Sequence, residues 1–425
     1  MSYYTSQIST KLIDPNVFVA NLRCEFQLPK NDYGNRMRLE NVGLFGGAPP
    51  EPSYNEYIGA LASIKSIRLL NGRDELDSCR ECNRHLSFKR FNKTTQRNIS
   101  YGQPSMKNDY SIVYSGTGTG DDAGTAIVQG QTSMDLGGLA NRTVQTTEEA
   151  TPKAYLDLRE VFPFLKTVEV LPASLFPQLR VVIEYETDVR NLISVDNQTV
   201  TTTRPLLACD VIEDKDLVMA MSKDLNGATW DAVEHDLIRI PAVNPAAANA
   251  PNTLTSRRLN GFNNKRLMRF YISKAPTNKA ENVGAGNAVR GGGDLMSQAL
   301  INEKFQVRIN GSNKISRDGA NNTKQRLSML VDAYGECSTY YGASRVGADQ
   351  GSFSIGLDGA RNDYYGMYIN DVVKDMEIQI TRDTFTNTVS ANFAKPQSSG
   401  YDVHVFGDVR KALVVNGSDY QIVYA

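Results

Sequence analysis

The sequence predicts an all-β protein made of two consecutive antiparallel domains. Two segments in which apolar and charged side chains alternate, residues 64–70 and 305–309, each run directly into an Asn-Gly pair, at 71–72 and at 310–311. Such a pair supplies the two positive-φ residues of a type I′ hairpin turn. The signature occurs once in each half of the chain, which indicates two versions of one β-domain. The length of 425 residues also exceeds the roughly 250–300 at which one hydrophobic core stops growing.

Composition and charge are those of an ordinary globular protein and exclude several functional classes. Hydrophobic residues make up 40% and charged residues 22%, while 33 Gly and 20 Tyr beside a single Trp favour turn-rich β structure. The 46 basic and 47 acidic residues leave a formal net charge of -1, so no global field draws the chain to nucleic acid or to an anionic membrane. No segment approaches the ~18 uninterrupted apolar residues of a membrane span, and the first residues lack the pattern of a secretory signal. The odd and sparse set of 5 Cys argues against a disulfide framework, so we expect folding in a reducing compartment.

Segments with a repeat of two residues follow one another along the chain. The first strand is expected over residues 18–26, and a turn at 29–32 ends it. Alternation of this kind buries one face and exposes the other, as in antiparallel sandwiches. Parallel α/β winding is not expected, because the amphipathic helices that it needs between strands are missing. The further expected strands are residues 64–70, 179–185, 206–212, 267–272, 305–309, 376–381 and 401–406.

Helical signals are short and local. Residues 214–221 predict a helix of two turns, with acidic residues at its positive N-terminal end, directly after the strand at 206–212. This pair is the candidate junction, so we expect an N-terminal domain at residues 1–212 and a C-terminal domain at 213–425.

Long insertions rich in small residues separate several strands. They lie at residues 115–124, 241–255 and 282–293. Loops longer than about 12–15 residues in compact domains are usually functional surfaces or disordered. Neighbours in an assembly could offset the entropy that ordering such loops costs.

Taken in order, these landmarks resemble a known family. The first half contains Tyr57-Ile58-Gly59-Ala60, then the 64–70 strand with its Asn-Gly turn, then Val170 to Pro177 and the 179–185 strand. The second half contains Phe262-Asn263-Asn264, the 267–272, 305–309 and 376–381 strands, and the closing segment from Val403 to Gly417. In order and spacing the chain is similar to the double jelly-roll major capsid proteins of DNA viruses. That lineage includes nucleocytoplasmic large DNA viruses, polinton-like viruses and virophages.

The resemblance implies two consecutive eight-stranded antiparallel jelly rolls with short helices and long loops. It implies a non-enzymatic structural protein of the virion, folded in the host cytoplasm or nucleus. The chain would assemble with itself into pseudo-hexagonal homotrimeric capsomers, which tile an icosahedral shell around the DNA genome beside penton and minor capsid proteins. An internal membrane or the genome is a candidate contact on the inner face, and no cofactor or small-molecule substrate is expected. Because this chain is at the short end of the family, its external loops should be modest.

Cys79, Cys82 and His85 are the sharpest candidate for metal chemistry. Two thiols at CxxC spacing with an imidazole close by have the spacing of zinc ligands. A structural zinc normally needs four ligands, however, and no second CxxC occurs in the sequence. The cysteines that would have to fold into reach are Cys24, Cys209 and Cys337. We therefore favour buried or surface thiols in a turn after the hairpin, and we assign no metal ligand.

A basic run follows at residues 80–97, where Glu81 is the single acidic residue and Phe88 and Phe91 are interleaved. Such a patch could contact genome phosphates or lipid headgroups on an inner capsid surface. The favoured interpretation is a solvated or inter-subunit face with the two Phe side chains in the core, because a charge run without a nucleic-acid motif specifies little. The basic residues are Arg80, Arg84, Lys89, Arg90, Lys93 and Arg97.

No motif indicates an enzyme. The glycine loop at residues 116–124 lacks the Gly-Lys-Ser/Thr ending of a phosphate cradle, and its Asp121 and Asp122 lack the alternating ligands of a calcium loop. His404 lies in an alternating strand, where a hydrogen-bonded or solvent-facing side chain is expected rather than a catalyst. The pair Glu148-Glu149 lies in a polar loop, although a glycosidase pair stays open among so many acidic residues. We assign no catalytic and no cofactor-binding residue.

Two alternatives to a capsid protein are kept open. The first is a non-enzymatic carbohydrate-binding or adhesion protein made of two β-sandwiches, which would show a shallow aromatic or calcium-bearing site. The second is a β-sandwich hydrolase, which would show a cleft with a carboxylate pair of perturbed pKa. A capsid protein would instead form a stable homotrimer.

Overall fold

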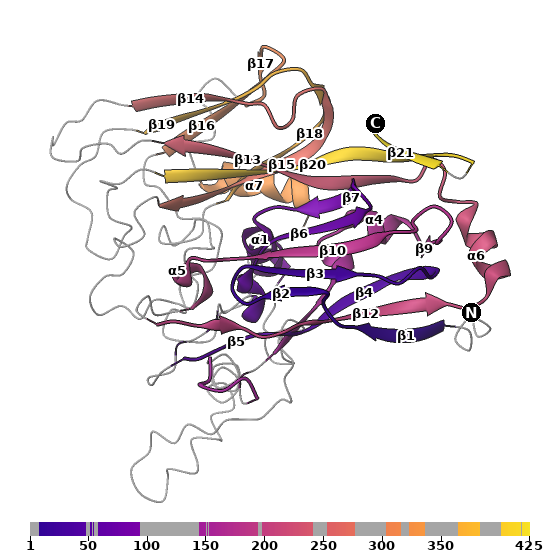
Figure 1. Cartoon of the computed structure of the whole chain (residues 1–425). Helices are drawn as coiled ribbons and strands as arrows, with labels where there is room; N and C mark the ends of the chain where they lie inside the picture. The colour runs from indigo at the N-terminus through magenta and orange to yellow at the C-terminus, as the bar shows by residue number, and fades with distance from the viewer. Residues whose placement is uncertain are drawn as a thin grey trace, which may run out of the picture.

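The computed structural model describes residues 8–47, 52, 54, 58–93, 144–149, 151, 153–193, 198–240, 253–276, 303–315, 323–335, 364–382, 401–417 and 419–425. All strand pairs recorded among these residues are antiparallel, and the predicted all-β fold class is confirmed. Figure 1 shows the strands of the N-terminal half, in indigo to pink, below those of the C-terminal half, in rose to yellow.

The N-terminal half forms a sandwich of two five-stranded sheets. Sheet 1 has the order β1 (Ile8–Ile13), β12 (Leu206–Ile212), β4 (Tyr33–Val42) and β8 (Ala154–Asp157), and β9 (Val170–Leu171) also pairs with β4. Sheet 2 has the order β2 (Val17–Val19), β3 (Arg23–Gln27), β10 (Leu179–Tyr185), β6 (Ile64–Asn71) and β7 (Asp74–Cys79). A small additional pair joins β5 (Leu44–Phe45) to β11 (Thr201–Thr202). Alternate residues of both sheets, such as Leu39 and Val181, are buried in the core between them.

The C-terminal half repeats this architecture. Sheet 3 has the order β13 (Thr229–Ile240), β20 (Tyr401–Asn416), β15 (Lys265–Pro276) and β18 (Tyr365–Val373), and β21 (Asp419–Tyr424) also pairs with β20. Sheet 4 has the order β14 (Thr253–Leu259), β19 (Met376–Arg382), β16 (Glu303–Ile309) and β17 (Ser312–Asn313). The core of this sandwich lies between sheets 3 and 4, where Ile272 and Val405 meet Val307 and Ile378.

The strands of sheets 1 and 2 end at Ile212, and those of sheets 3 and 4 begin at Thr229. Helix α6 (Lys215–Ser222) lies between them, close to the helix predicted at 214–221. The Asp214 side chain caps α6 by accepting hydrogen bonds from the backbone N–H groups of Asp216 and Leu217, at 2.9 and 3.2 Å. The division of the chain into independent domains at residue 212 stays a prediction.

The expectation that helices are only short and local is wrong at two places. Helices α1 (Cys82–Lys93) and α7 (Thr323–Tyr334) each span 12 residues. Besides α6, the described residues contain the short helices α4 (Pro163–Thr167) and α5 (Val189–Leu192) and the 3-10 turns η2 (Ala60–Ser63) and η4 (Leu158–Glu160). No helix in the described part of the chain is long and apolar enough to cross a membrane.

The two Asn-Gly hairpins differ from each other. Asn310 and Gly311 have φ of 52° and 80° and connect Ile309 to its partner Ser312, which confirms the predicted pair of positive-φ residues. In the first hairpin Asn71 still pairs with Asp74, so the turn residues are Gly72 and Arg73 and only Gly72 has positive φ. The type I′ prediction is wrong there. The Asn71 side chain instead accepts a hydrogen bond from the backbone N–H of Gln178 at 2.9 Å.

The strand expected over residues 18–26 is also corrected. Strand β2 ends at Val19 and β3 starts at Arg23, so the segment is a tight hairpin between two strands. Asn21 lies in the turn with φ of 60°, and its side chain accepts a hydrogen bond from the backbone N–H of Thr202 at 2.7 Å. Asn tolerates the left-handed region because its side chain can bond to nearby backbone groups.

Candidate functional site at the joint between the sandwiches

The two sandwiches meet at a joint between α1 and the outer face of sheet 3. Phe88 of α1 stacks on Tyr271 of β15, with ring centroids 3.6 Å apart and an interplanar angle of 13°. Tyr271 also stacks on Phe406 of β20 at 4.9 Å, and Tyr334 at the end of α7 meets the Phe88 ring edge-on at 5.2 Å. These side chains belong to the same hydrophobic core as the N-terminal sandwich. The joint is therefore a continuation of that core.

Paired charges surround the aromatic centre of the joint. The Arg269 guanidinium lies 2.5 Å from a carboxylate oxygen of Asp408, which is 6% exposed. Burial raises the pKa of Asp408 above its ordinary value, although Arg269 opposes the shift. Lys411 Nζ lies 3.4 Å from a carboxylate oxygen of Glu234. Removing one member of such a pair leaves an uncompensated charge, so the pairs fix which groups face each other.

Asp77 of β7 is a further buried carboxyl group close to the joint. It accepts hydrogen bonds from the backbone N–H of Phe164 at 2.9 Å and from that of Ser78 at 3.0 Å. Burial raises its pKa to about 7, against the lowering effects of these bonds and of the Lys411 charge. Asp77 thereby ties the start of α4 to sheet 2.

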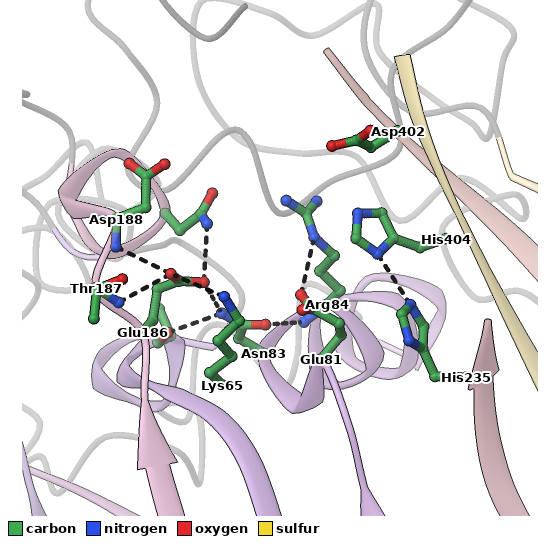
Figure 2. Close-up of polar contacts among 12 residues, drawn as sticks. Lys65, Glu81, Asn83, Arg84, Glu186, Thr187, Asp188, His235, Asp402 and His404 are labelled. Carbon is green, nitrogen blue, oxygen red and sulfur yellow. Dashed lines mark hydrogen bonds and ion pairs between the residues drawn. The ribbon is translucent and has the colours of Figure 1, made fainter. Parts of the chain in front are cut away.

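A buried carboxylate anchors the first turn of α1 to the end of β10 (Figure 2). Glu186 is 3% exposed and accepts hydrogen bonds from the backbone N–H groups of Thr187 and Asp188, both at 3.0 Å. Its other oxygen accepts from the side-chain amides of Asn83 at 3.2 Å and Asn191 at 3.0 Å. Burial alone would raise the pKa of Glu186, but the bond from Asp188, the Lys65 charge and the two amides hold it below its ordinary value. The carboxylate is a fixed structural anion.

Two histidines hydrogen-bond to each other on the same side of the joint (Figure 2). His235 Nε2 of β13 lies 3.0 Å from His404 Nδ1 of β20. The expectation that His404 is hydrogen-bonded is confirmed, and its side chain is 7% exposed. Sequence patterning could not show the pairing, because the two residues are 169 positions apart and meet only through the β13–β20 register.

The structure separates His85 from the two thiols of the CxxC pair. Cys79 ends β7 and Cys82 begins α1, on either side of the turn at Arg80 and Glu81, and both are fully buried, which confirms buried thiols at a turn after the hairpin. The two thiols hydrogen-bond to each other, and burial raises the pKa of Cys82. His85 Nδ1 instead lies 2.9 Å from the Tyr271 hydroxyl. The described residues contain no group of three or more His, Cys, Asp or Glu side chains placed for a metal ion, and Cys337 lies outside them.

The basic run belongs to the joint where it is described. Arg84 is 3% exposed and lies 3.6 Å from Glu81, so a solvated or inter-subunit face is wrong for this residue. Lys89 Nζ donates a hydrogen bond to the backbone carbonyl of Glu160 at 2.7 Å. The expected core position of Phe88 is confirmed. The side chains of Arg90, Phe91 and Lys93, and the whole of Arg97, lie outside the described residues.

The remaining candidates give no site. The glycine loop at 116–124 with Asp121 and Asp122, and the insertion at 282–293, lie outside the described residues, as do residues 241–252. Glu148 lies 3.8 Å from Lys153 at an exposed position. Glu149, its neighbour, lies in the same turn.

A second surface feature is an apolar free edge of the N-terminal sandwich, which the sequence did not reveal. Strands β1 and β2 are the terminal strands of sheets 1 and 2, and among the described residues each pairs with one neighbouring strand. Leu12 and Leu22 are 61% and 60% exposed, and three further apolar side chains of the edge are exposed as well. The members of this apolar edge are Ile8, Leu12, Val17, Val19 and Leu22. Figure 1 shows β1 and β2 on the side of the N-terminal sandwich away from the C-terminal strands.

Charges beside the apolar edge are already paired within the chain. Glu25 of β3 lies 2.8 Å from Arg23 and 3.1 Å from Arg180. The surface therefore offers apolar side chains and unpaired strand backbone to a partner, and such edges are ready templates for pairing with another chain.

No protein-family model matches the sequence, and no curated protein matches it. Solved structures do match, over almost the whole chain. A chain of the PBCV-1 virus capsid is 11% identical with a TM-score of 0.52, covering 98% of this chain and 97% of that chain. A chain of the Sputnik virophage is 11% identical with a TM-score of 0.54, covering 100% and 89%. The Faustovirus major capsid protein is 9% identical with a TM-score of 0.51, covering 96% and 90%. The likeness confirms the double jelly-roll fold.

Proposed function

We propose that this chain is a major capsid protein of a DNA virus. The observation that carries the proposal is that the fold likeness includes both sandwiches together and extends over at least 96% of this chain in the three comparisons above. One of those structures is a major capsid protein by name, that of Faustovirus, and another is a chain of the PBCV-1 virus capsid. A likeness over a single sandwich would be weak support for this function, because one fold serves many functions.

The proposed action is self-assembly. Homotrimers with a pseudo-hexagonal outline would tile an icosahedral shell, with penton and minor capsid proteins at its special positions and an internal membrane or the genome beneath. The apolar edge supports self-association, because exposed apolar side chains on a free sheet edge are stabilised when a second copy covers them. The near-balanced charge, 46 basic and 47 acidic residues, lets many copies pack without strong mutual repulsion. The role is structural rather than enzymatic, and its place is the virion.

The test is the native mass of the full chain by light scattering coupled to size exclusion, with negative-stain images of the same peak. We expect a trimer of three times 46.9 kDa with a pseudo-hexagonal outline, or shells that assemble from it. A monodisperse monomer that never assembles would contradict the proposal. Binding to a glycan array by such a monomer would favour the carbohydrate-binding alternative.

A pair of variants tests the apolar edge within the same experiment. Leu12→Glu places a charge on the edge strand β1, and we expect it to weaken the trimer at least about tenfold if the edge is buried between copies. Tyr155→Glu is the control, since β8 lies at the opposite end of sheet 1 and Tyr155 is 39% exposed. Equal assembly of Leu12→Glu and the unchanged chain would show that the edge is not part of the contact.

A further inference from the structure

All three histidines of the chain lie at the joint, although they come from distant parts of the sequence. His85 is on α1, His235 on β13 and His404 on β20. The ring of Phe406 connects them, with centroids 5.9 Å from His85 and 4.9 Å from His235. His85 and His404 are only 2% and 7% exposed. None of the three side chains belongs to the core between sheets 3 and 4.

The hydrogen bond between two of these histidines requires that the accepting ring stays uncharged. Between His235 Nε2 and His404 Nδ1, at 3.0 Å, one nitrogen must donate and the other must accept. An imidazolium has two donors and no acceptor, so a proton on the accepting nitrogen breaks this bond. His85 Nδ1 lies 2.9 Å from the Tyr271 hydroxyl, and Nε2 of the same ring is buried without a partner in the described part of the chain. A proton on Nε2 would place a charged donor where the described residues offer no acceptor.

The surroundings of the three rings carry more positive than negative charge. Arg84 of α1 and Arg80 of the preceding turn act on His235, and only Asp236 opposes them. The positive charges of Lys89, Lys166 and Arg269 likewise disfavour a proton on His85. Glu81 is paired with Arg84, Asp408 with Arg269, and Asp402 with Arg239. Beside His404 the cross-strand neighbours are Leu237 of β13 and Ser273 of β15, and neither is charged.

These contacts give the joint a built-in response to acid. We propose that His85, His235 and His404 form an acid-sensitive latch, which holds the two sandwiches together when uncharged and releases them when protonated, while each sandwich keeps its own sheets. The positive charge taken up would lie on sheet 3 and on α1, across the joint from each other and beside Arg84. The latch is a property of the single chain, so it operates in a monomer as in a capsomer and does not depend on the proposed function.

The pH range follows from the histidines themselves. Burial, with the charges of Arg84 and Arg80, lowers the pKa of His235 from 6.5 to about 4, and burial lowers that of His85 well below its ordinary value. An open joint exposes the rings and restores ordinary values, so the open form binds more protons below pH 6.5. The closed joint is therefore favoured fully above that pH and loses its advantage as the pH falls toward 4. Each responding histidine raises the opening equilibrium constant up to about tenfold per pH unit in this range.

The single Trp of the chain provides a probe at the joint. Trp230 of β13 is 3% exposed and meets Phe164 of the N-terminal half at a centroid distance of 5.0 Å. We expect its fluorescence emission to shift to longer wavelength between pH 6.5 and 4, before the far-UV circular dichroism of the sheets is lost. Hydrogen exchange should rise in α1 over the same range, with the strands of sheet 4 still protected.

Two kinds of variant separate the latch from general acid unfolding. The double variant His235→Gln, His404→Gln keeps hydrogen-bonding side chains but cannot take up the proton, so its acid midpoint should move down by at least about half a pH unit. Arg80→Gln changes an exposed residue and no histidine. Arg80→Gln removes a charge that repels the proton on His235, so it should also lower the acid midpoint and make the pH dependence of opening less steep. This variant provides the test if the double variant does not fold. An emission shift that coincides with loss of the sheets, or midpoints unchanged in both variants, would overturn the latch.

Discussion

Glu186 should be the most sensitive polar residue at the joint. The change to test is Glu186→Gln, which keeps the shape of the side chain but replaces one carboxylate oxygen by an amide group that can only donate. Each oxygen of Glu186 now accepts from two donors, two backbone N–H groups on one side and the amides of Asn83 and Asn191 on the other. Whichever way the new amide turns, two donors lose their acceptor: either the buried amides of Asn83 and Asn191 or the partly exposed backbone N–H groups of Thr187 and Asp188.

The expected loss follows from that count. A fully buried donor without an acceptor costs about 1–3 kcal/mol, and the amide can turn toward the backbone pair, whose partly exposed donors regain water, so we expect a decrease of about 1–3 kcal/mol in the free energy of unfolding at pH 7. The measurement is urea unfolding followed by circular dichroism. The matched control is Glu184→Gln, two residues earlier on β10, whose side chain is 51% exposed and pairs with Arg68 at 3.1 Å. An exposed ion pair of that kind predicts a loss of no more than about 1 kcal/mol.

The pH dependence gives a second criterion. The pKa of Glu186 is held below 4.5 in the folded chain, so its ionised form adds stability above that pH and the addition is lost as the pH falls further. The difference between Glu186→Gln and the unchanged chain should therefore be largest near neutral pH and shrink below pH 4.5. A loss equal to that of Glu184→Gln, or a difference that grows in acid, would refute the assignment of Glu186 as a buried anion that anchors α1.

Three further changes test packing and charge elsewhere. Gly407→Ala would place a Cβ 2.5 Å from the ring of Phe262, so we expect a loss of about 1–3 kcal/mol from overpacking, whereas Gly34→Ala, whose Cβ meets nothing closer than 3.7 Å, should change stability little. Phe88→Ala removes the central ring of the joint and should cost about 3–5 kcal/mol in urea unfolding; a loss below about 1 kcal/mol would show that α1 does not hold the joint. Because burial raises the pKa of Asp77 to about 7, its carboxyl group destabilises the fold increasingly as the pH rises from 3.8 toward 7. The stability of the unchanged chain relative to Asp77→Asn should therefore improve as the pH is lowered across that window, and a constant difference would contradict the shift.

The strands were predictable because the alternation of apolar and polar residues within each one reflects which of its faces is buried. Residues 179–185 coincide with β10, and the alternating 376–381 and 401–406 segments lie within β19 and β20. The register of the second hairpin followed from Asn310-Gly311, since both turn residues need positive φ. The turn type predicted for the first hairpin was wrong because the side chain of Asn71 accepts a hydrogen bond from the backbone N–H of Gln178, which is distant in the sequence. No local pattern reports such a contact.

Helix α1 shows why the candidate site was not predictable. Its polar residues Asn83, Arg84 and His85 are all buried, so the described side chains of its first turns give no exposed polar face for an amphipathic pattern to reveal. Two of these residues have partners from distant parts of the chain, Glu186 for Asn83 and Tyr271 for His85. The sequence therefore presents a basic run where the structure has a buried connector.

The joint and the apolar edge are separate parts of the structure. The edge lies on strands β1 and β2, whose neighbours along each sheet belong to the N-terminal sandwich, and it faces away from sheet 3. The joint buries its aromatic rings and histidines between the halves, where no second copy is needed to complete them. Contacts between copies and contacts within a copy can therefore be altered separately. A chain built in this way can loosen internally in acid while its contacts with other copies persist, and Leu12→Glu combined with the double histidine variant would show whether the two effects add.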